Sequence, residues 1–187
     1  MARLLDLAEE AAPEVAAHME RTARLARRFA VEAGLPDTLL TAVARTAQLH
    51  DIGKLAIPPW VLEKPGPLNE PERRLMRGHP VMGQRMVERK PALIGIGPLI
   101  RATHERWDGH GYPDRLKAAS IPLPSRIVAV CDAFDAMTNS RVYNHVRTSE
   151  EAIADLRRGS GTQFDPGAVT LFCDIFEERI DLCAMGA

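Results

Sequence analysis

Side chains of the types that bind metal ions occur in two prominent places along this chain. His50 and Asp51 are adjacent, and a stretch rich in His, Asp and Gly runs from Thr103 to Pro113. Imidazole nitrogens and carboxylate oxygens together suit Mn, Fe or Zn, and the two oxygens of one aspartate can bridge two ions. We therefore expect a hydrolase that uses two metal ions, with the later stretch forming a substrate loop.

Some of these candidate ligands carry more information than a lone histidine would. Glu14 and His18 are four residues apart on a predicted helix, so they share a face, although such pairs are also common on helix surfaces. His50 and Asp51 come at the end of an apolar helix, and Asp132 lies within another. A carboxylate in such surroundings is costly without a partner, which favours a nearby cation.

The remaining histidines are weaker evidence when each is taken alone. His79 precedes a proline and His104 lies in a Thr-His-Glu triplet, and we treat both as candidate ligands. We interpret His110 and His145 as ordinary loop or surface residues. The case for a metal site therefore depends on several positions acting together.

The elements that must position these side chains are predicted to be helices. Apolar residues at spacings of three and four predict helices over 14–33, 37–50, 97–106 and 125–139. We expect Asp37 to be the N-cap of the second helix and Gly53 to stop it. Capping signals predict three further starts, at Asn69, Thr148 and Asp165.

Prolines divide the middle of the chain. Segment 57–69 holds four prolines and a glycine, so we expect a loop with at most a short helical turn. Asn69 with Glu72 resembles a capping box, and Pro80 interrupts or restarts the helix that reaches His79. Strand-like alternation is almost absent. We expect an all-α fold, a compact helical bundle in which residues 1–187 form a single domain.

The overall composition narrows the class of protein. The chain has 187 residues, 45% of them hydrophobic, which is enough for one domain with a core. Its net charge of −1 disfavours long nucleic acid and anionic membranes as partners. Cys131, Cys173 and Cys183 show no disulfide-like spacing, and we find no signal peptide or membrane-spanning run, so we expect a cytoplasmic protein.

The motifs together resemble those of the HD-GYP family. The resemblance covers residues 14–176, nearly the whole chain. It rests on HDIGK at 50–54, LEKPGPLNEPE at 62–72, GHP at 78–80, DGHGYP at 108–113, IPLPSRIVAVCDAFDAMTNSRVY at 121–143 and GTQFDP at 161–166.

This resemblance implies a fold, an activity and a set of metal ligands. The family is an all-α variant of the HD hydrolase fold, and its active members hydrolyse cyclic di-GMP with two or three iron or manganese ions. The first ion would be held by His18, His50, Asp51 and Asp132. Asp51 would also bridge to a second ion held by His79 and His104. Glu14 matches an acidic residue that some members use for a third metal.

The resemblance also assigns roles in the reaction. The two ions, bridged by Asp51, would activate a hydroxide. This hydroxide would attack phosphorus in line with the leaving oxygen. Lys54 matches a lysine that stabilises the developing charge or protonates the leaving oxygen. Gly111 and Tyr112 in the loop, together with Arg141, would contact the substrate.

Three positions depart from the family pattern and keep alternatives open. Thr103 replaces the first of two consecutive histidines, which removes a strong donor from the second metal site. Asn144 stands where many relatives have a basic residue, and Arg115 stands where a glycine is frequent. A non-catalytic module that binds nucleotide or a signalling partner is the main alternative. A phosphohydrolase acting on a mononucleotide is a weaker one.

Overall fold

The computed structural model describes residues 1–139 and 146–184, and these ranges contain helices and no strand. The α-helices are α1 (Ala2–Ala11), α2 (Pro13–Glu32), α3 (Asp37–Leu49), α4 (Pro59–Leu62), α5 (Glu70–Met76), α6 (His79–Glu88), α7 (Gly97–Arg101), α8 (Leu123–Thr138), α9 (Ser149–Gly159) and α10 (Pro166–Ala184). Three short 3-10 helices join them, η1 (Ile52–Ala56), η2 (Pro91–Ile96) and η3 (Ala118–Ser120). The predicted all-α fold is confirmed. Among the described helices, none has the length and apolar character needed to cross a bilayer.

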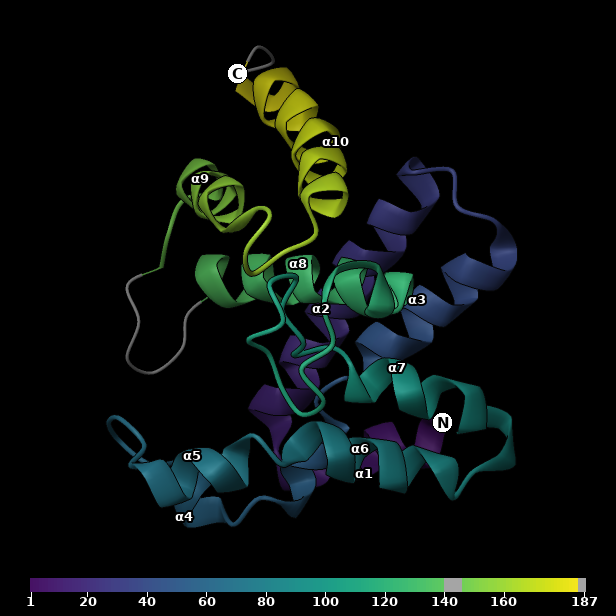
Figure 1. The fold of residues 1–187 in the computed structure, drawn as a ribbon, viewed down its shortest axis with the longest axis vertical. Helices are drawn as coiled ribbons and strands as arrows, with labels where there is room; N and C mark the ends of the chain where they lie inside the picture. Colours follow the sequence, from purple (N-terminus) through teal and green to yellow (C-terminus); the bar gives the residue numbers. More distant parts are fainter. Residues whose placement is uncertain (140–145, 185–187) are drawn as a thin grey trace.

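One hydrophobic cluster joins helices α2, α3, α8, α9 and α10. Helix α8 packs on both α2 and α3, and α9 and α10 pack on α8 (Figure 1). The aromatic residues of this cluster are Phe29 from α2, Phe134 from α8, Phe164 from the turn before α10, and Phe172 and Phe176 from α10. Burial of this apolar surface is the main force that holds α8 in place.

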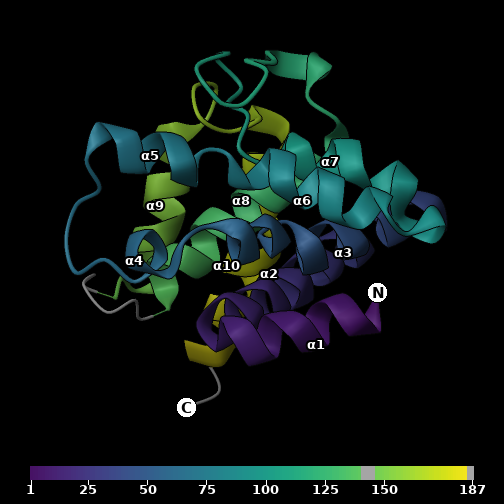
Figure 2. The ribbon, with the colours of Figure 1, turned by 90° about the horizontal axis from the view of Figure 1, so that it is seen from below.

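A second hydrophobic cluster joins the N-terminal helix to the middle of the chain. It contains Leu4 and Ala8 from α1, Met19 from α2, and Leu49 and Ile52 around the end of α3. Residues of α6, η2 and α7 complete it. In Figure 2, α1 lies along α2 on the side of the molecule opposite the loop that follows α7. The candidate site borders this cluster, because three of its residues are neighbours in sequence of candidate ligands: Met19 follows His18, Leu49 precedes His50, and Ile52 follows Asp51.

Most predicted helix starts agree with the structure. Asn69 and Thr148 each form a capping box, with Glu72 and Glu151 respectively. Asp37 is not an N-cap as expected; Pro36 has that position, and Asp37 is the first helical residue, where its carboxylate is close to the positive helix end. Segment 57–69 contains a single four-residue helix, α4, as predicted.

Two other expectations about helix boundaries were wrong. The helix predicted over 97–106 ends at Arg101, and the chain then turns through His104. Helix α3 ends without help from Gly53, which lies inside η1. Gly53 is needed there for close packing, because a Cβ at this position would lie 1.9 Å from the carbonyl oxygen of His79. The close approach of the Gly53 backbone to His79 places the segment that carries His50 and Asp51 against the start of α6.

Candidate metal centre and substrate pocket

Four imidazole rings surround the carboxylate of Asp51. The Nε2 atoms of His18 and His50 lie 3.7 and 3.5 Å from its Oδ2 atom. The Nε2 atoms of His79 and His104 lie 3.1 and 3.8 Å from its Oδ1 atom. Each oxygen of Asp51 therefore faces its own pair of histidines, which is the arrangement of a carboxylate that bridges two ions.

The donor atoms around Asp51 fit two divalent cations. They form two groups that could each hold a metal ion, one of His18, His50 and Asp51 and the other of Asp51, His79 and His104. The Nε2 atoms of all four histidines and Oδ1 of Asp51 are buried, and none makes a hydrogen bond of normal geometry, although carboxylate oxygens of Asp51 and Asp132 lie 2.8 to 3.8 Å from the four nitrogens. Unsatisfied buried donors and acceptors are costly, and a cation between them would remove that cost.

Hydrogen bonds to the other ring nitrogen orient the histidines. Nδ1 of His50 donates to the carbonyl of Ala47, and Nδ1 of His79 donates to the carbonyl of Met76, both at 2.8 Å. With the proton on Nδ1, each ring presents the lone pair of Nε2 to Asp51. These rings are set by their own local backbone, three residues upstream.

Asp132 lies on the side of the first metal group. Its Oδ1 atom is 2.8 Å from Nε2 of His18 and 3.7 Å from Nε2 of His50. Burial alone would raise the pKa of Asp132, but the imidazoles of His18 and His50 hold it well below its usual range. The structure thus places a second carboxylate, besides that of Asp51, next to this histidine pair.

Lys54 forms an ion pair with Oδ2 of Asp51. Burial would raise the pKa of Asp51, but the ammonium of Lys54 and the ring of His50 hold it well below its usual range. Lys54 is three residues after Asp51 in the sequence, and its side chain reaches the carboxylate because the 3-10 helix η1 begins directly after Asp51. Lys54 therefore places a positive charge at the same carboxylate that would join the two ions.

Thr103 is buried, and its hydroxyl donates to the carbonyl of Ile100 at 2.8 Å. The residue therefore makes a local hydrogen bond, while its neighbour His104 faces Asp51. The ring of His104 also stacks on Tyr112, with centroids 5.3 Å apart and an interplanar angle of 5°. The second group thus has two histidines and Asp51, with Tyr112 beside one of them.

Glu105 and two glycines shape the loop that carries Tyr112. The carboxylate of Glu105 accepts hydrogen bonds from the backbone N–H groups of Asp114 and Leu116, at 2.6 and 3.1 Å. Gly109 has a φ of +83°, which favours glycine. Gly111 is required for close packing, because a Cβ there would lie 2.5 Å from the Cα of Glu105.

A pocket of about 370 Å³ opens beside the second group of ligands. Thr103, His104, Tyr112 and Asp132 contribute to its wall. Arg77 also lines it, with its guanidinium carbon 5.9 Å from the centre of the Tyr112 ring. Arg77 was not among the predicted site residues, and its only signal in the sequence is a basic side chain two residues before His79.

Other predicted site residues lie outside this arrangement. Glu14 is exposed on α2 and belongs to neither metal group of the described residues. His110 is exposed, as expected, with 83% of its side chain accessible. Arg141, Asn144 and His145 lie outside the residues that the structure describes.

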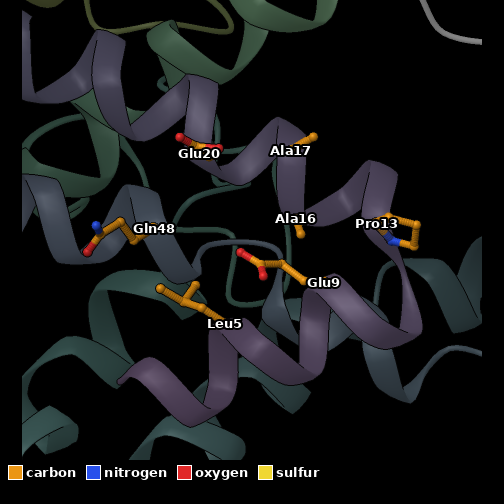
Figure 3. A pocket seen from close by; sticks show the side chains of 7 residues that line it. All are labelled: Leu5, Glu9, Pro13, Ala16, Ala17, Glu20 and Gln48. Carbon is orange, nitrogen blue, oxygen red and sulfur yellow. The ribbon is translucent and has the colours of Figure 1, made fainter.

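A second hollow, of about 220 Å³, lies between α1 and α2 (Figure 3). Its polar lining consists of Glu9, Glu20 and Gln48. Glu20 is exposed and pairs with Arg24, and none of the lining residues belongs to a metal group. We therefore place the candidate substrate site in the pocket beside Tyr112.

Comparison with known proteins identifies the family of this chain. The model of the HD domain family matches residues 3–168. The chain belongs to the HD domain family. This membership confirms the resemblance that the motifs indicated.

Two curated relatives of this HD domain are phosphodiesterases. The cyclic di-GMP phosphodiesterase of Thermotoga maritima is 40% identical over 88% of the chain and 45% of its own length. The 3'3'-cGAMP-specific phosphodiesterase 2 of Vibrio cholerae is 36% identical over 97% of the chain and 35% of its own length. The chain thus spans less than half the length of either relative.

A solved HD domain shares the fold. The HD domain of the L. monocytogenes phosphodiesterase PgpH, in complex with cyclic-di-AMP, matches with a TM-score of 0.67. The match covers 95% of this chain and 96% of that domain at 18% sequence identity. At this identity, the likeness supports the helical HD architecture alone.

Proposed function

We propose that this HD domain hydrolyses a phosphodiester bond of a cyclic dinucleotide, with cyclic di-GMP as the first candidate substrate. The observation that carries the proposal is Asp51, whose two oxygens face separate pairs of histidines. The substrate class is supported by two relatives of the chain, which are named as phosphodiesterases of cyclic di-GMP and of 3'3'-cGAMP.

We propose that His18, His50, Asp51 and Asp132 hold one divalent ion, and that Asp51, His79 and His104 hold another. Iron or manganese suits this mixture of imidazole and carboxylate donors. Two such ions, when bound, lower the pKa of water and neutralise charge on the phosphoryl oxygens. A third ion at Glu14 stays a prediction from the sequence.

The chain's own side chains would bind and orient the substrate. Lys54 would stabilise the charge that develops on the phosphoryl group or supply a proton to the leaving oxygen, because its ammonium already lies beside Asp51. Tyr112 would contact the nucleotide from the loop, where Gly111 lets the backbone approach Glu105. Arg141 would bind phosphate, as the family resemblance implies.

A binding module without turnover is the second candidate function. Thr103 favours it, since its hydroxyl hydrogen bonds to the Ile100 carbonyl and the second group has two histidines. Loss of the second ion would leave a pocket that binds nucleotide without the charge neutralisation that hydrolysis needs. Interaction with signalling proteins also stays a prediction.

A turnover assay with matched variants separates these functions. We would load the protein with Mn²⁺, or with Fe²⁺ without oxygen, and measure hydrolysis of cyclic di-GMP, 3'3'-cGAMP and cyclic-di-AMP. We expect turnover of at least one of them, and a loss of about 100-fold or more in Asp51→Asn because Asp51 would join both ions. Asp165→Asn, which changes a buried carboxylate elsewhere, is the control. Binding of a dinucleotide without turnover would establish the second function instead.

A further inference from the structure

The ring of His18 lies between two carboxylates of α8. Its Nε2 atom is 2.8 Å from Oδ1 of Asp132, and its Nδ1 atom is 2.7 Å from Oδ2 of Asp135. Asp132 and Asp135 are three residues apart, so they lie on one face of the helix. A single turn of α8 therefore contacts both nitrogens of this candidate ligand.

Asp135 is held rigidly in this position. It is 1% exposed, and Arg21 donates to its Oδ1 from Nε at 3.0 Å and to its Oδ2 from Nη2 at 3.1 Å. Asn139 donates to Oδ1 as well, at 3.0 Å. Burial would raise the pKa of Asp135, but His18 and Arg21 lower it. Asp135 is thus a carboxylate acceptor, and Nδ1 of His18 is the donor.

His18 differs in this respect from the other histidines with a bonded Nδ1. His50 and His79 donate to carbonyl groups three residues upstream in their own segments. His18 donates to a charged group that lies 117 residues away in the sequence. A carboxylate partner makes an imidazole a more basic ligand than a backbone carbonyl does, and it fixes the tautomer.

We propose that Asp135 is a positioning residue for the first metal position, where it keeps the proton of His18 on Nδ1 and leaves Nε2 free to bind the ion. This inference rests on the proposed metal centre but adds a residue that does not touch the ion. Arg21 and Asn139 serve the same purpose indirectly, because they fix both oxygens of Asp135. Loss of such a partner typically weakens metal binding by about 10- to 100-fold.

Asp135→Asn tests this role with little change in shape. Oδ1 accepts hydrogen bonds from both Arg21 and Asn139, whereas Oδ2 accepts from Nη2 of Arg21 and from His18, so we expect the new amide nitrogen to replace Oδ2 and to face His18 at the loss of the Nη2 hydrogen bond. It would donate to Nδ1 and move the ring proton to Nε2, the atom that should bind metal. Asp165→Asn is the control, since Asp165 is a buried carboxylate that pairs with Arg126, also on α8.

The experiment measures Mn²⁺ binding to the full chain by titration calorimetry. It also measures the tautomer of His18 by nitrogen NMR of the metal-free protein at about pH 10.5, because only the neutral ring has a tautomer. Burial would lower the pKa of His18, but Asp132 and Asp135 raise it to about 9. We expect one of the two Mn²⁺ sites to weaken about 10- to 100-fold in Asp135→Asn, the other to change less than threefold, and the proton to shift to Nε2. Asp165→Asn should bind Mn²⁺ as the wild type does. Unchanged binding, or an unchanged tautomer, in Asp135→Asn would overturn the inference.

A second variant keeps the test decisive if Asp135→Asn does not fold. Arg21→Gln retains the carboxylate but removes two of its donors, so the first site should weaken by a smaller factor of about three to ten while His18 keeps its tautomer. Equal affinity in Arg21→Gln and the wild type would then overturn the inference. A wild-type chain that binds no Mn²⁺ would overturn the metal centre itself, which distinguishes failure of the proposed function from failure of this inference.

Discussion

The ring of His104 and the ring of Tyr112 are parallel within 5°, with their centroids 5.3 Å apart. His104 also faces Oδ1 of Asp51, and Tyr112 lines the pocket. The stacked pair thus joins a candidate metal ligand to the wall of the candidate substrate site. A change in the loop that carries Tyr112 should therefore affect metal and nucleotide binding together.

Replacement of Tyr112 should separate these two effects. Tyr112→Phe retains the stacked ring but removes the hydroxyl, so we expect Mn²⁺ affinity within about twofold of the wild type and KM raised about tenfold, near 1.4 kcal/mol. Tyr112→Leu removes the stacking and should weaken the second Mn²⁺ site as well. Calorimetry and steady-state kinetics measure the two quantities. Equal Mn²⁺ affinity in both variants would show that the stacking does not support His104.

Replacement of Thr103 tests whether the second site lacks a donor. Thr103→His adds an imidazole beside His104, so we expect the second Mn²⁺ to bind at least tenfold more tightly. Thr103→Val keeps the shape and removes the hydroxyl that bonds to Ile100. It should leave Mn²⁺ affinity unchanged and lower the free energy of unfolding by about 1 kcal/mol. Weaker Mn²⁺ binding in Thr103→Val would show that the hydroxyl is itself a ligand.

Gly53→Ala should destabilise the fold and displace His79. The added Cβ would lie 1.9 Å from the carbonyl oxygen of His79 and 2.5 Å from the backbone nitrogen of Gly83, so the backbone must shift. We expect a loss of about 2–3 kcal/mol in the free energy of unfolding, measured in urea. Gly95→Ala is the control, because a Cβ there meets no atom within 4 Å. Similar stabilities of the two variants would contradict the close packing.

Arg115→Gly should stabilise the loop after Pro113. Arg115 has a φ of +56°, a conformation that favours glycine and costs other residues about 1 kcal/mol. Because glycine also makes the unfolded chain more flexible, we expect a net gain of about 0.5 kcal/mol in the free energy of unfolding. Ala118→Gly, at a φ of +50°, should behave similarly. A loss of stability in both variants would argue against backbone strain at these positions.

The sequence predicted the candidate ligands better than it predicted the residues that hold them in place. His50, Asp51 and Asp132 could be found because polar groups beside apolar helical residues are costly without partners. Asp135 was missed because its role depends on contact between α8 and α2, which spacing along the chain does not reveal. The end of α7 at Arg101 was missed for a similar reason. The turn after it lets Glu105 bind the backbone of the Tyr112 loop, whereas apolar spacing alone favoured a longer helix.

The role of glycine at two positions was also hidden in the sequence. Gly53 was expected to stop a helix and Gly111 to contact the substrate, and neither has a positive φ. Both are instead required where two backbone segments approach closely, Gly53 at His79 and Gly111 at Glu105. Such tertiary approaches leave no local pattern in a single sequence.

The positions of bound Mn²⁺ in crystals of the full chain, measured by anomalous diffraction at the manganese edge, test directly whether Asp51 joins two metal ions. We predict two peaks, one on either side of Asp51. One should lie between Oδ2, His18 and His50, and the other between Oδ1, His79 and His104. A single peak, or two peaks that do not share Asp51, would contradict this prediction.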